Sequence, residues 1–436
     1  MPPYNITYPM KNLAACLLTL LFTYVALGQS NSAEIAAGDW TFRMDGDPTP
    51  QRVQLVADGD SVRGRVYGRP FASAVETGKI SFETGGYAWT GTLEGDRITG
   101  DIVTRQRSWT WSAERYRPPT TPRSFQYEPD VYYRLLSSDA EPALRVFSGD
   151  TIHTTTVDAA GWSTGGYRER GNRVTEGGNP LTGPFYVEGT LPGDIVVIKL
   201  LSVRLNRNWA YSGDALQSNV LDPAYLSERN VEGNLVQWTL DTDQGVARLQ
   251  DPTPALADYE VPLTPFLGSI AVAPSGGQRL SSRDAGPWGG NMEFIEVREG
   301  ATVFLPVGAE GAYLFLGDGH AVQGDGELTG DALETSMDVT FTVDVQRYRF
   351  RNTPRVETPE YLSSIGIAGS LDQAITKATS DMARWLEEEY RLSSTETALV
   401  MGTAVQYDVP DMVPPQFSIA IRVSRAVLNR IPVREN

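Results

Sequence analysis

Pairs of apolar residues two positions apart recur between residues 35 and 116, and this spacing is the period of a half-buried strand. The pairs are Trp40 and Phe42, Val53 and Leu55, Ile80 and Phe82, Tyr87 and Trp89, and Trp109 and Trp111. Turn signals separate them, at Asp58-Gly59-Asp60, Gly85-Gly86 and Gly95-Asp96. The pattern predicts a small antiparallel β-meander or barrel over residues 35–116, with the paired aromatic side chains in its core.

A proline-rich segment follows this first unit. The run Arg117-Pro118-Pro119-Thr120-Thr121-Pro122 is stiff and extended, because proline fixes φ and cannot continue a strand ladder. Residues 117–128 are therefore predicted to be a linker, and residues 129–436 a second, larger domain.

The larger domain repeats one local pattern three times, beginning at Leu144, Phe185 and Phe294. Each repeat is a short strand, a glycine turn and a second strand rich in β-branched residues, as in a β-hairpin. Stacked hairpins build sandwiches and jelly rolls. The fold class predicted for this domain is therefore mainly β, with a jelly-roll or sandwich-like core.

Helical signals appear only late in the chain. Ser370 and Ser393 each stand where a helix N-cap is expected, three residues before Gln or Glu. Met382 and Trp385 lie on one apolar stripe of the first helix, which we expect to pack on the sheet. These helices predict a smaller α+β part beside the β core.

The N-terminal residues have the pattern of a secretory signal peptide. Lys11 precedes an apolar run over residues 13–27, which is short for a membrane span, and small residues follow. Residues 1–28 are therefore predicted to be cleaved, whether translation starts at Met1 or Met10, and Cys16 leaves with them. We expect an exported protein, periplasmic or secreted, with no membrane attachment after cleavage.

Composition excludes several function classes. With 37 Lys+Arg against 54 Asp+Glu, the formal net charge is −17, which disfavours nucleic-acid binding. One Cys and two His exclude Cys-rich zinc sites and disulfide frameworks. No G-x-S-x-G elbow accompanies either histidine, which argues against a Ser-His-Asp triad. His153 lies among threonines of a predicted strand, and we interpret it as structural.

A glycine-rich stretch near residue 320 carries the most specific chemical signal. Asp318 and His320 are two residues apart, as are Asp325 and Glu327, so each pair can face one side of a strand. A histidine and several carboxylates on one face predict a divalent-metal site with nitrogen and oxygen ligands. Such an ion lowers the pKa of bound water, and a nearby carboxylate can take its proton.

Four motifs of the larger domain resemble the acetamidase/formamidase family. They are Asn179-Pro180-x-Thr182-Gly183-Pro184-Phe185-Tyr186-Val187, Pro192-Gly193-Asp194, Gly289-Gly290-Asn291-Met292-Glu293 and Gly317-Asp318-Gly319-His320-Ala321-x-Gln323-Gly324-Asp325-Gly326-Glu327. The resemblance runs from about Val146 towards the C-terminus, and it implies hydrolysis of a short linear amide, of the formamide or acetamide type, to a carboxylate and ammonia. It also implies a metal-assisted homo-oligomer that binds a small amide substrate.

The resemblance also suggests roles for individual residues. It implies that Asp158, Glu293 and His320 are candidate metal ligands; zinc is our first choice of ion, with calcium or manganese as alternatives. Asp325 and Glu327 become candidates for proton transfer. Asn291 becomes a candidate anchor of the substrate amide, so that the catalytic set is Glu327, Asp325 and Asn291.

The alternative hypothesis is that the protein binds a ligand without catalysing a reaction. An exported ligand-binding β protein on the same scaffold would use the N-terminal aromatic residues to bind a glycan. The glycine-rich site would then hold a small ligand without turnover. Metal-dependent ammonia release distinguishes the two hypotheses.

Overall fold

The computed structural model describes residues 32–47, 49–164, 173–228, 233–413 and 415–432. The predicted signal peptide, residues 1–28, lies outside the described residues. The chain divides between Arg117 and Pro118 into two compact units, which are described separately below. Among the described residues, no helix combines the length and apolar character needed to cross a membrane.

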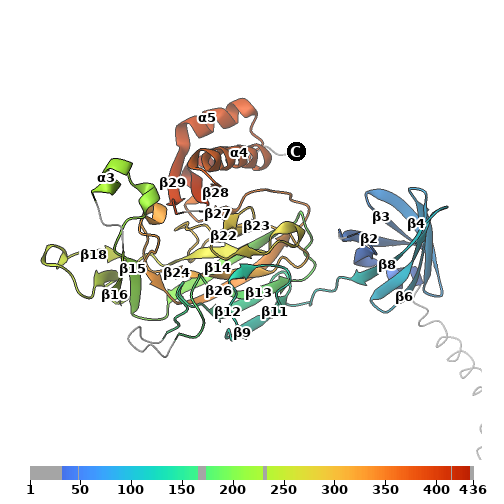
Figure 1. The fold of residues 1–436 in the computed structure, drawn as a ribbon. Helices are drawn as coiled ribbons and strands as arrows, with labels where there is room; N and C mark the ends of the chain where they lie inside the picture. Colours follow the sequence, from blue (N-terminus) through green and yellow to red (C-terminus); the bar gives the residue numbers. More distant parts are fainter. Residues whose placement is uncertain (1–31, 48, 165–172, 229–232, 414, 433–436) are drawn as a thin grey trace, which may run out of the picture. The chain divides into compact units, whose positions relative to one another are not determined.

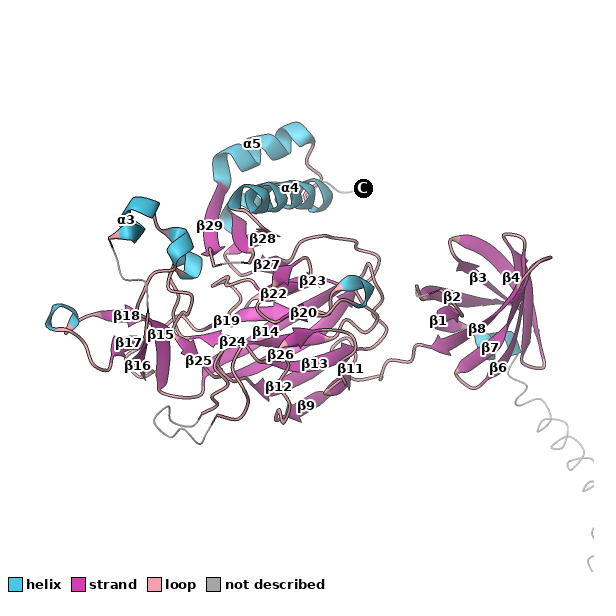
Figure 2. Cartoon of the chain, viewed as in Figure 1, coloured by secondary structure: helices cyan, strands magenta, loops and turns pink. Residues whose placement is uncertain are grey.

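The first unit is a closed β-barrel, as the alternating pattern predicted (Figure 2). Each strand pairs antiparallel with the next, and β1 also pairs with β8 to close the ring. The strands are β1 (Gly38–Met44), β2 (Gln51–Asp58), β3 (Ser61–Val66), β4 (Arg69–Glu76), β5 (Lys79–Thr84), β6 (Tyr87–Glu94), β7 (Arg97–Val103) and β8 (Ser108–Arg115).

Aromatic side chains fill the barrel interior. Phe71 stacks on Phe82, which stacks on Trp89, and Trp89 meets Trp111 edge to face. The short helix α2 (Ser32–Ala36) closes one end, where the Ala36 carbonyl accepts a hydrogen bond from Trp40 Nε1 at 2.9 Å. Most of the paired aromatic residues are thus core, but Tyr87 is 42% exposed and Trp109 only partly buried.

The larger unit contains two extended β-sheets. One sheet has the strand order β29-β30-β28-β27-β23-β14-β26-β12-β9. The other has the order β18-β17-β16-β15-β25-β24-β19-β22-β21, with β13 joining β11 to β24. A separate pair joins β10 (Leu135–Leu136) and β20 (Leu280–Ser281).

The bounds of these strands follow in sheet order. The first sheet consists of β29 (Val405–Asp411), β30 (Phe417–Ser424), β28 (Tyr361–Ala368), β27 (Arg355–Glu357), β23 (Thr302–Pro306), β14 (Ile195–Leu205), β26 (Met337–Gln346), β12 (Thr151–Thr155) and β9 (Ser124–Tyr127). The second consists of β18 (Glu260–Pro262), β17 (Val246–Leu249), β16 (Leu235–Asp241), β15 (Trp209–Gly213), β25 (Glu334–Thr335), β24 (Leu314–His320), β19 (Phe266–Ala271), β22 (Gly289–Asn291), β21 (Ala285–Gly286), β11 (Leu144–Val146) and β13 (Leu181–Val187).

The main hydrophobic core combines side chains from both sheets, so the predicted mainly β, sandwich-like architecture is confirmed. Ile198 of β14 and Phe341 of β26 belong to the same buried cluster as Leu267 of β19 and Leu316 of β24. Every residue of β19 and β24 is buried. Because β24 is covered on both faces, polar side chains on it are withdrawn from solvent.

The three predicted hairpins are wrong. In the first, β11 pairs with β13 while β12 pairs with β26 and β9, so the glycine turn joins strands of different sheets. In the second, β13 pairs with β24 and β14 pairs with β23. In the third, the segment near Phe294 is not a strand. The predicted linker also ends early, because Ser124–Tyr127 forms β9.

Helices pack on the first sheet near the C-terminus, where the sequence predicted them (Figure 1). Helix α4 (Leu371–Glu389) buries Met382 and Trp385, and its N-cap Ser370 accepts from the Gln373 amide. Helix α5 (Ser394–Ala404) begins with a complete capping box. The remaining short helices are α3 (Pro223–Ser227), α6 (Arg425–Leu428), η1 (Ser218–Val220), η2 (Pro254–Leu256), η3 (Ser275–Gly277) and η4 (Asp325–Glu327).

Close packing of α4 on β28 gives a stability prediction. A Cβ at Gly366 of β28 would lie 1.9 Å from the Ala374 carbonyl oxygen of α4, whereas one at Gly369 would meet nothing within 4 Å. We expect Gly366→Ala to lower the free energy of unfolding by about 3 kcal/mol, because backbone would have to move. Gly369→Ala is the matched control and should stay near wild type in urea unfolding. Equal stability of the two variants would contradict this packing.

Candidate functional site

A buried group of one histidine and four carboxylates lies on the second sheet. Strand β24 supplies Asp318 and His320, as predicted, and β25 supplies Glu334. Glu327 comes from the η4 turn, and Glu293 from the segment after β22. His320 and Glu334 are directly paired across β24 and β25, so the sheet register itself brings them together.

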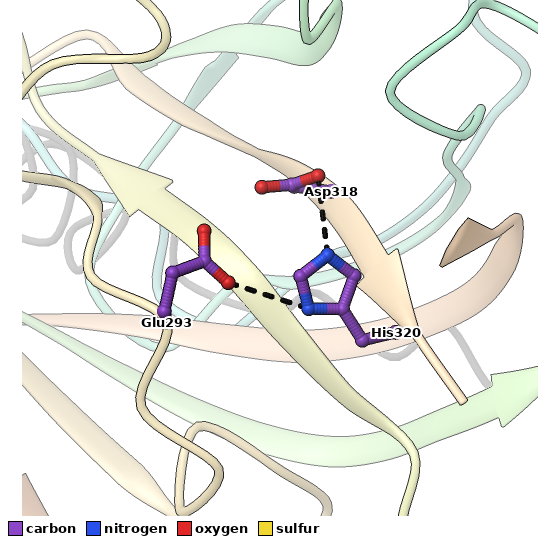
Figure 3. A group of neighbouring side chains, drawn as sticks. All are labelled: Glu293, Asp318 and His320. Atoms are coloured by element: carbon purple, nitrogen blue, oxygen red, sulfur yellow. Dashed lines mark ion pairs between the residues drawn. The ribbon is translucent and has the colours of Figure 1, made fainter. Parts of the chain in front are cut away.

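Figure 3 shows three of these side chains, Glu293, Asp318 and His320, in close contact. His320 Nδ1 lies 3.3 Å from Glu293 Oε2, and His320 Nε2 lies 3.4 Å from Asp318 Oδ1. The shortest contact joins His320 Nε2 and Glu334 Oε1 at 2.9 Å. His320 and Glu293 are fully buried, and Asp318, Glu327 and Glu334 are at most 7% exposed.

Gln323 determines which nitrogen of His320 carries a proton. Its Nε2 donates to the carbonyl oxygens of Glu293 and Pro410, both at 3.1 Å. Its Oε1 therefore faces His320 Nδ1, at 2.9 Å, and accepts a hydrogen bond from it. With Nδ1 protonated, the lone pair of a neutral His320 lies on Nε2, the nitrogen beside Glu334 and Asp318.

Gly268 on β19 makes room for the group. A Cβ there would lie 2.6 Å from Glu293 Oε2 and 2.9 Å from both Asp318 Oδ2 and His320 Cε1. Any larger residue would push the carboxylates apart. The absence of a side chain at this position is thus a local requirement of the site.

The group has the properties of a cation site. Among the described residues, both carboxylate oxygens of Glu293, Glu334 Oε2 and His320 Nε2 are buried and make no well-aligned hydrogen bond, although Glu293 Oε2 and His320 Nε2 make the ion-pair contacts given above. Buried charges are otherwise paired or bound to a metal. Donor atoms lie within 4.8 Å of one another in two overlapping sets, Glu293–Asp318–His320 and His320–Glu327–Glu334. That spacing suits an ion about 2.0–2.6 Å from each donor, so these residues could hold a metal ion.

The pKa values show the electrostatic cost of this arrangement. Burial raises the pKa of Glu334 to about 8, although His320 opposes the shift. Burial also raises the pKa values of Glu293 and Glu327 well above their usual range. Burial acts the same way on Asp318, but His320 outweighs it and its pKa falls. The His320 pKa is raised well above normal, since Glu334, Glu293 and Asp318 outweigh burial.

Two further acids stand at the margin of the group. Burial and the charge of Asp318 raise the pKa of Asp331 to about 6. Burial raises the pKa of Asp411 to about 7, against a hydrogen bond from the Val413 amide. A cavity of about 280 Å³ is lined in part by Thr329 and Asp331.

Asn291 is tied to the group through a second amide. Asn179 Nδ2 donates to Asn291 Oδ1 at 2.5 Å and to Asp318 Oδ2 at 3.0 Å. Because Asn291 uses its oxygen in this contact, its NH₂ group can donate to other acceptors. The predicted position of Asn291 beside the site therefore agrees with the geometry.

The structure places Asp158 outside the group of carboxylates. Its Oδ2 accepts from Arg207 Nη2 at 2.7 Å, and its Oδ1 accepts from the Ala160 and Trp162 amides. The same Arg207 nitrogen donates to the Glu334 carbonyl at 3.1 Å. Asp158 thus orients Arg207, which hydrogen-bonds to the backbone of the strand that carries Glu334. Asp158 itself is not placed to be a metal ligand.

Asp325 is also outside the group, because it is exposed on the η4 turn and does not lie on a strand. Glu327, two residues on, has φ +46° and turns inward, where its Oε1 accepts from the Ala332 amide at 3.1 Å. Sequence reasoning missed Glu334, which no motif marks. Asn179 and Gln323 lie within two of the motifs that resemble the acetamidase/formamidase family, but the sequence indicated no role for them.

Comparison with known proteins agrees with this geometry. Residues 281–408 match the model of the acetamidase/formamidase family. This segment contains the histidine and all four carboxylates of the site. The chain carries an acetamidase/formamidase family domain.

Solved structures extend the likeness of the domain to most of the larger unit. A predicted acetamidase/formamidase from Thermoanaerobacter tengcongensis is 26% identical in sequence to this chain, with a TM-score of 0.60. The match covers 72% of this chain and 100% of that chain. An acetamidase from Bacillus halodurans is 25% identical in sequence, also with a TM-score of 0.60. That match covers 71% of this chain and 100% of the acetamidase chain.

Curated relatives match over a shorter segment. The acetamidase of Mycolicibacterium smegmatis is 27% identical over 263 residues, which are 44% of this chain and 62% of that protein. The chain spans between 55% and 62% of the lengths of the curated relatives it matches.

Glu334, which the sequence analysis missed, gives the first test of metal binding by this group. Glu334→Gln removes a buried carboxylate 2.9 Å from His320 Nε2, so we expect divalent-metal affinity to fall at least about tenfold. The exposed Asp325→Asn is the matched control and should retain the wild-type metal content. Both would be measured by elemental analysis after dialysis against limiting zinc. Full retention of metal by Glu334→Gln would exclude Glu334 as a ligand.

Stability of the metal-free protein should fall as pH rises. Glu334 is protonated in the folded chain up to a pH of about 8, whereas in the unfolded chain it ionises near 4.5. The folded state then binds more protons, so the free energy of unfolding decreases through this window. The raised His320 pKa acts with the same sign above a pH of about 6.5.

Thermal melts of chelated protein from pH 5.5 to 8.5 would measure this effect. We expect the melting temperature to drop by several degrees in the wild type and less in Glu334→Gln, and added divalent metal should reduce the drop. A chelated wild type whose stability rises with pH would contradict the assignment.

Proposed function

We propose that this chain is an exported amidohydrolase that cleaves the C–N bond of short linear amides to a carboxylate and ammonia. The observation that carries the proposal is the buried His320 group, whose orphaned donor atoms fit a metal ion and which lies inside the acetamidase/formamidase segment. The N-terminal signal pattern supports export. The names of the relatives support formamide and acetamide as the first substrates to test.

We propose zinc as the resident ion, held by His320 Nε2 with Glu334, Asp318 and Glu293. The imidazole nitrogen in the donor set favours zinc over calcium or manganese, which prefer oxygen ligands. When bound, the ion supplies Lewis acidity and lowers the pKa of water at the site. It also keeps the surrounding carboxylates ionised, against the burial that raises their pKa values.

Glu327 is suited to transfer the proton. It is the most exposed of the four carboxylates, at 7%, and its Oε1 accepts a hydrogen bond from the Ala332 amide. As a carboxylate it takes a proton from the attacking water, and it returns that proton to the departing nitrogen when the C–N bond breaks. We assign to Asn291, which is held through Asn179, the role of donating its amide hydrogens to the substrate carbonyl oxygen, where negative charge develops.

Ammonia release from formamide, acetamide and propionamide tests the proposal. We expect activity in the purified protein, loss on stringent chelation, and recovery with zinc rather than calcium. Glu327→Gln should lower kcat by about 10²–10⁴ with metal content unchanged. The control Asp325→Asn should remain near wild type, because Asp325 is exposed.

Each negative outcome would overturn a different part of the proposed function. Near-normal turnover in Glu327→Gln would exclude Glu327 as the base. Activity that survives chelation would exclude the metal. No ammonia from any of the three amides, in folded and metal-loaded protein, would overturn the assignment to short amides and favour the ligand-binding alternative.

A further inference from the structure

A cavity opens at the end of the β-barrel opposite α2. Its volume is about 350 Å³, within the range of about 300–1,000 Å³ that small-molecule sites occupy. The rings of Tyr67, Tyr87, Trp89 and Trp109 line it, with Asp47 and Arg69 among the polar groups. The barrel lies outside the segment that matches the acetamidase/formamidase family, so the amidase chemistry does not account for this cavity.

The aromatic rings that line the cavity differ in exposure. Tyr87 and Trp109 lie 6.1 Å apart between centroids and are inclined at 51°, and Tyr67 and Tyr87 are 40% and 42% exposed. Trp89 is 4% exposed and part of the barrel core, yet among the described residues its indole N–H has no hydrogen-bond partner. A buried donor of this kind calls for an acceptor.

Tyr67 is held in an unusual conformation. It is the first of the two residues that connect β3 and β4, with φ +49°, a position that favours Asn, Asp or Gly. A bulky residue there is strained. Its hydroxyl donates to Asp47 Oδ2 at 2.7 Å, so two turns at this end of the barrel are joined at the rim of the cavity.

Charges of both signs stand at this rim. The hydrogen bond from Tyr67 lowers the pKa of Asp47, which keeps that carboxylate ionised. The Arg69 side chain lies over the turn at Gly85, where a Cβ would be 3.0–3.2 Å from its Cδ, Nη1 and Nε atoms. An anion would be repelled by Asp47 and by the ring faces, and a cation by Arg69.

We propose that this cavity binds a neutral sugar ring of a glycan. The C–H edges of such a ring stack on the electron-rich faces of Tyr87 and Trp109, and its hydroxyls can both donate to Asp47 and accept from Arg69 and Trp89. The exposed rims of Tyr67 and Tyr87 leave the cavity open, so a unit of a longer chain can enter. The proposal stands independently of the amidase function.

Calorimetric titration of the full chain with neutral oligosaccharides tests the proposal. The probes are hexamers of glucose linked β-1,4, glucose linked α-1,4, xylose and N-acetylglucosamine, with tetramethylammonium as the cationic probe, each up to about 10 mM. We expect saturable binding of at least one hexamer. Tyr87→Ala and Trp109→Ala should each weaken it at least about fivefold. Phe350→Ala is the matched control, because Phe350 is 76% exposed on the other unit, and it should bind as wild type.

Three outcomes would overturn the proposal. They are no binding of any hexamer, hexamer binding that neither cavity variant changes, and binding of tetramethylammonium alone. If Trp109→Ala does not fold, Tyr87→Ala decides the matter, since its ring is largely outside the barrel core. Ammonia release, measured on the same preparations, reports separately on the amidase function.

Discussion

The contact of one buried histidine with several carboxylates is the constraint on which the larger unit depends. His320 Nε2 lies 2.9 Å from Glu334, and Glu293 and Asp318 stand at 3.3 and 3.4 Å from its two nitrogens. Negative charges this close repel one another strongly away from water. They remain together only where protons or a cation compensate them and where the surrounding structure prevents their separation. Both the raised pKa values of Glu293 and Glu334 and the buried oxygen atoms without a hydrogen bond result from this crowding of buried carboxylates.

The β-sandwich holds the carboxylates and His320 together in several independent ways. Register places Glu334 opposite His320, and the lack of a side chain at Gly268 leaves space for the carboxylates. Gln323 fixes the His320 ring from one side. From the other side, Arg207 binds the Glu334 carbonyl and is itself oriented by Asp158. Asp158 therefore acts on the site through Arg207 and not by joining the buried group of histidine and carboxylates.

Local signals were predictable from the sequence, and long-range pairing was not. The two-residue spacing of Asp318 and His320 correctly placed them on one strand, and the cap at Ser393 correctly placed a helix. Glu334 could not be found this way, because it joins the site only through the register of β25 against β24. The hairpins failed for a related reason. A glycine turn between two strands has the same sequence pattern whether the strands pair or pass into opposite sheets.

The charge of the centre also bears on the proposed reaction. With His320 neutral and Glu293, Asp318, Glu327 and Glu334 ionised, one divalent ion leaves the group with an excess of two negative charges. A neutral amide can approach such a centre, whereas its product is a carboxylate that the same charges repel. Repulsion of this kind assists product release and disfavours the reverse reaction. In the proposed mechanism the partner of the substrate carbonyl is the uncharged Asn291, which suits product release because another cation there would retain the carboxylate.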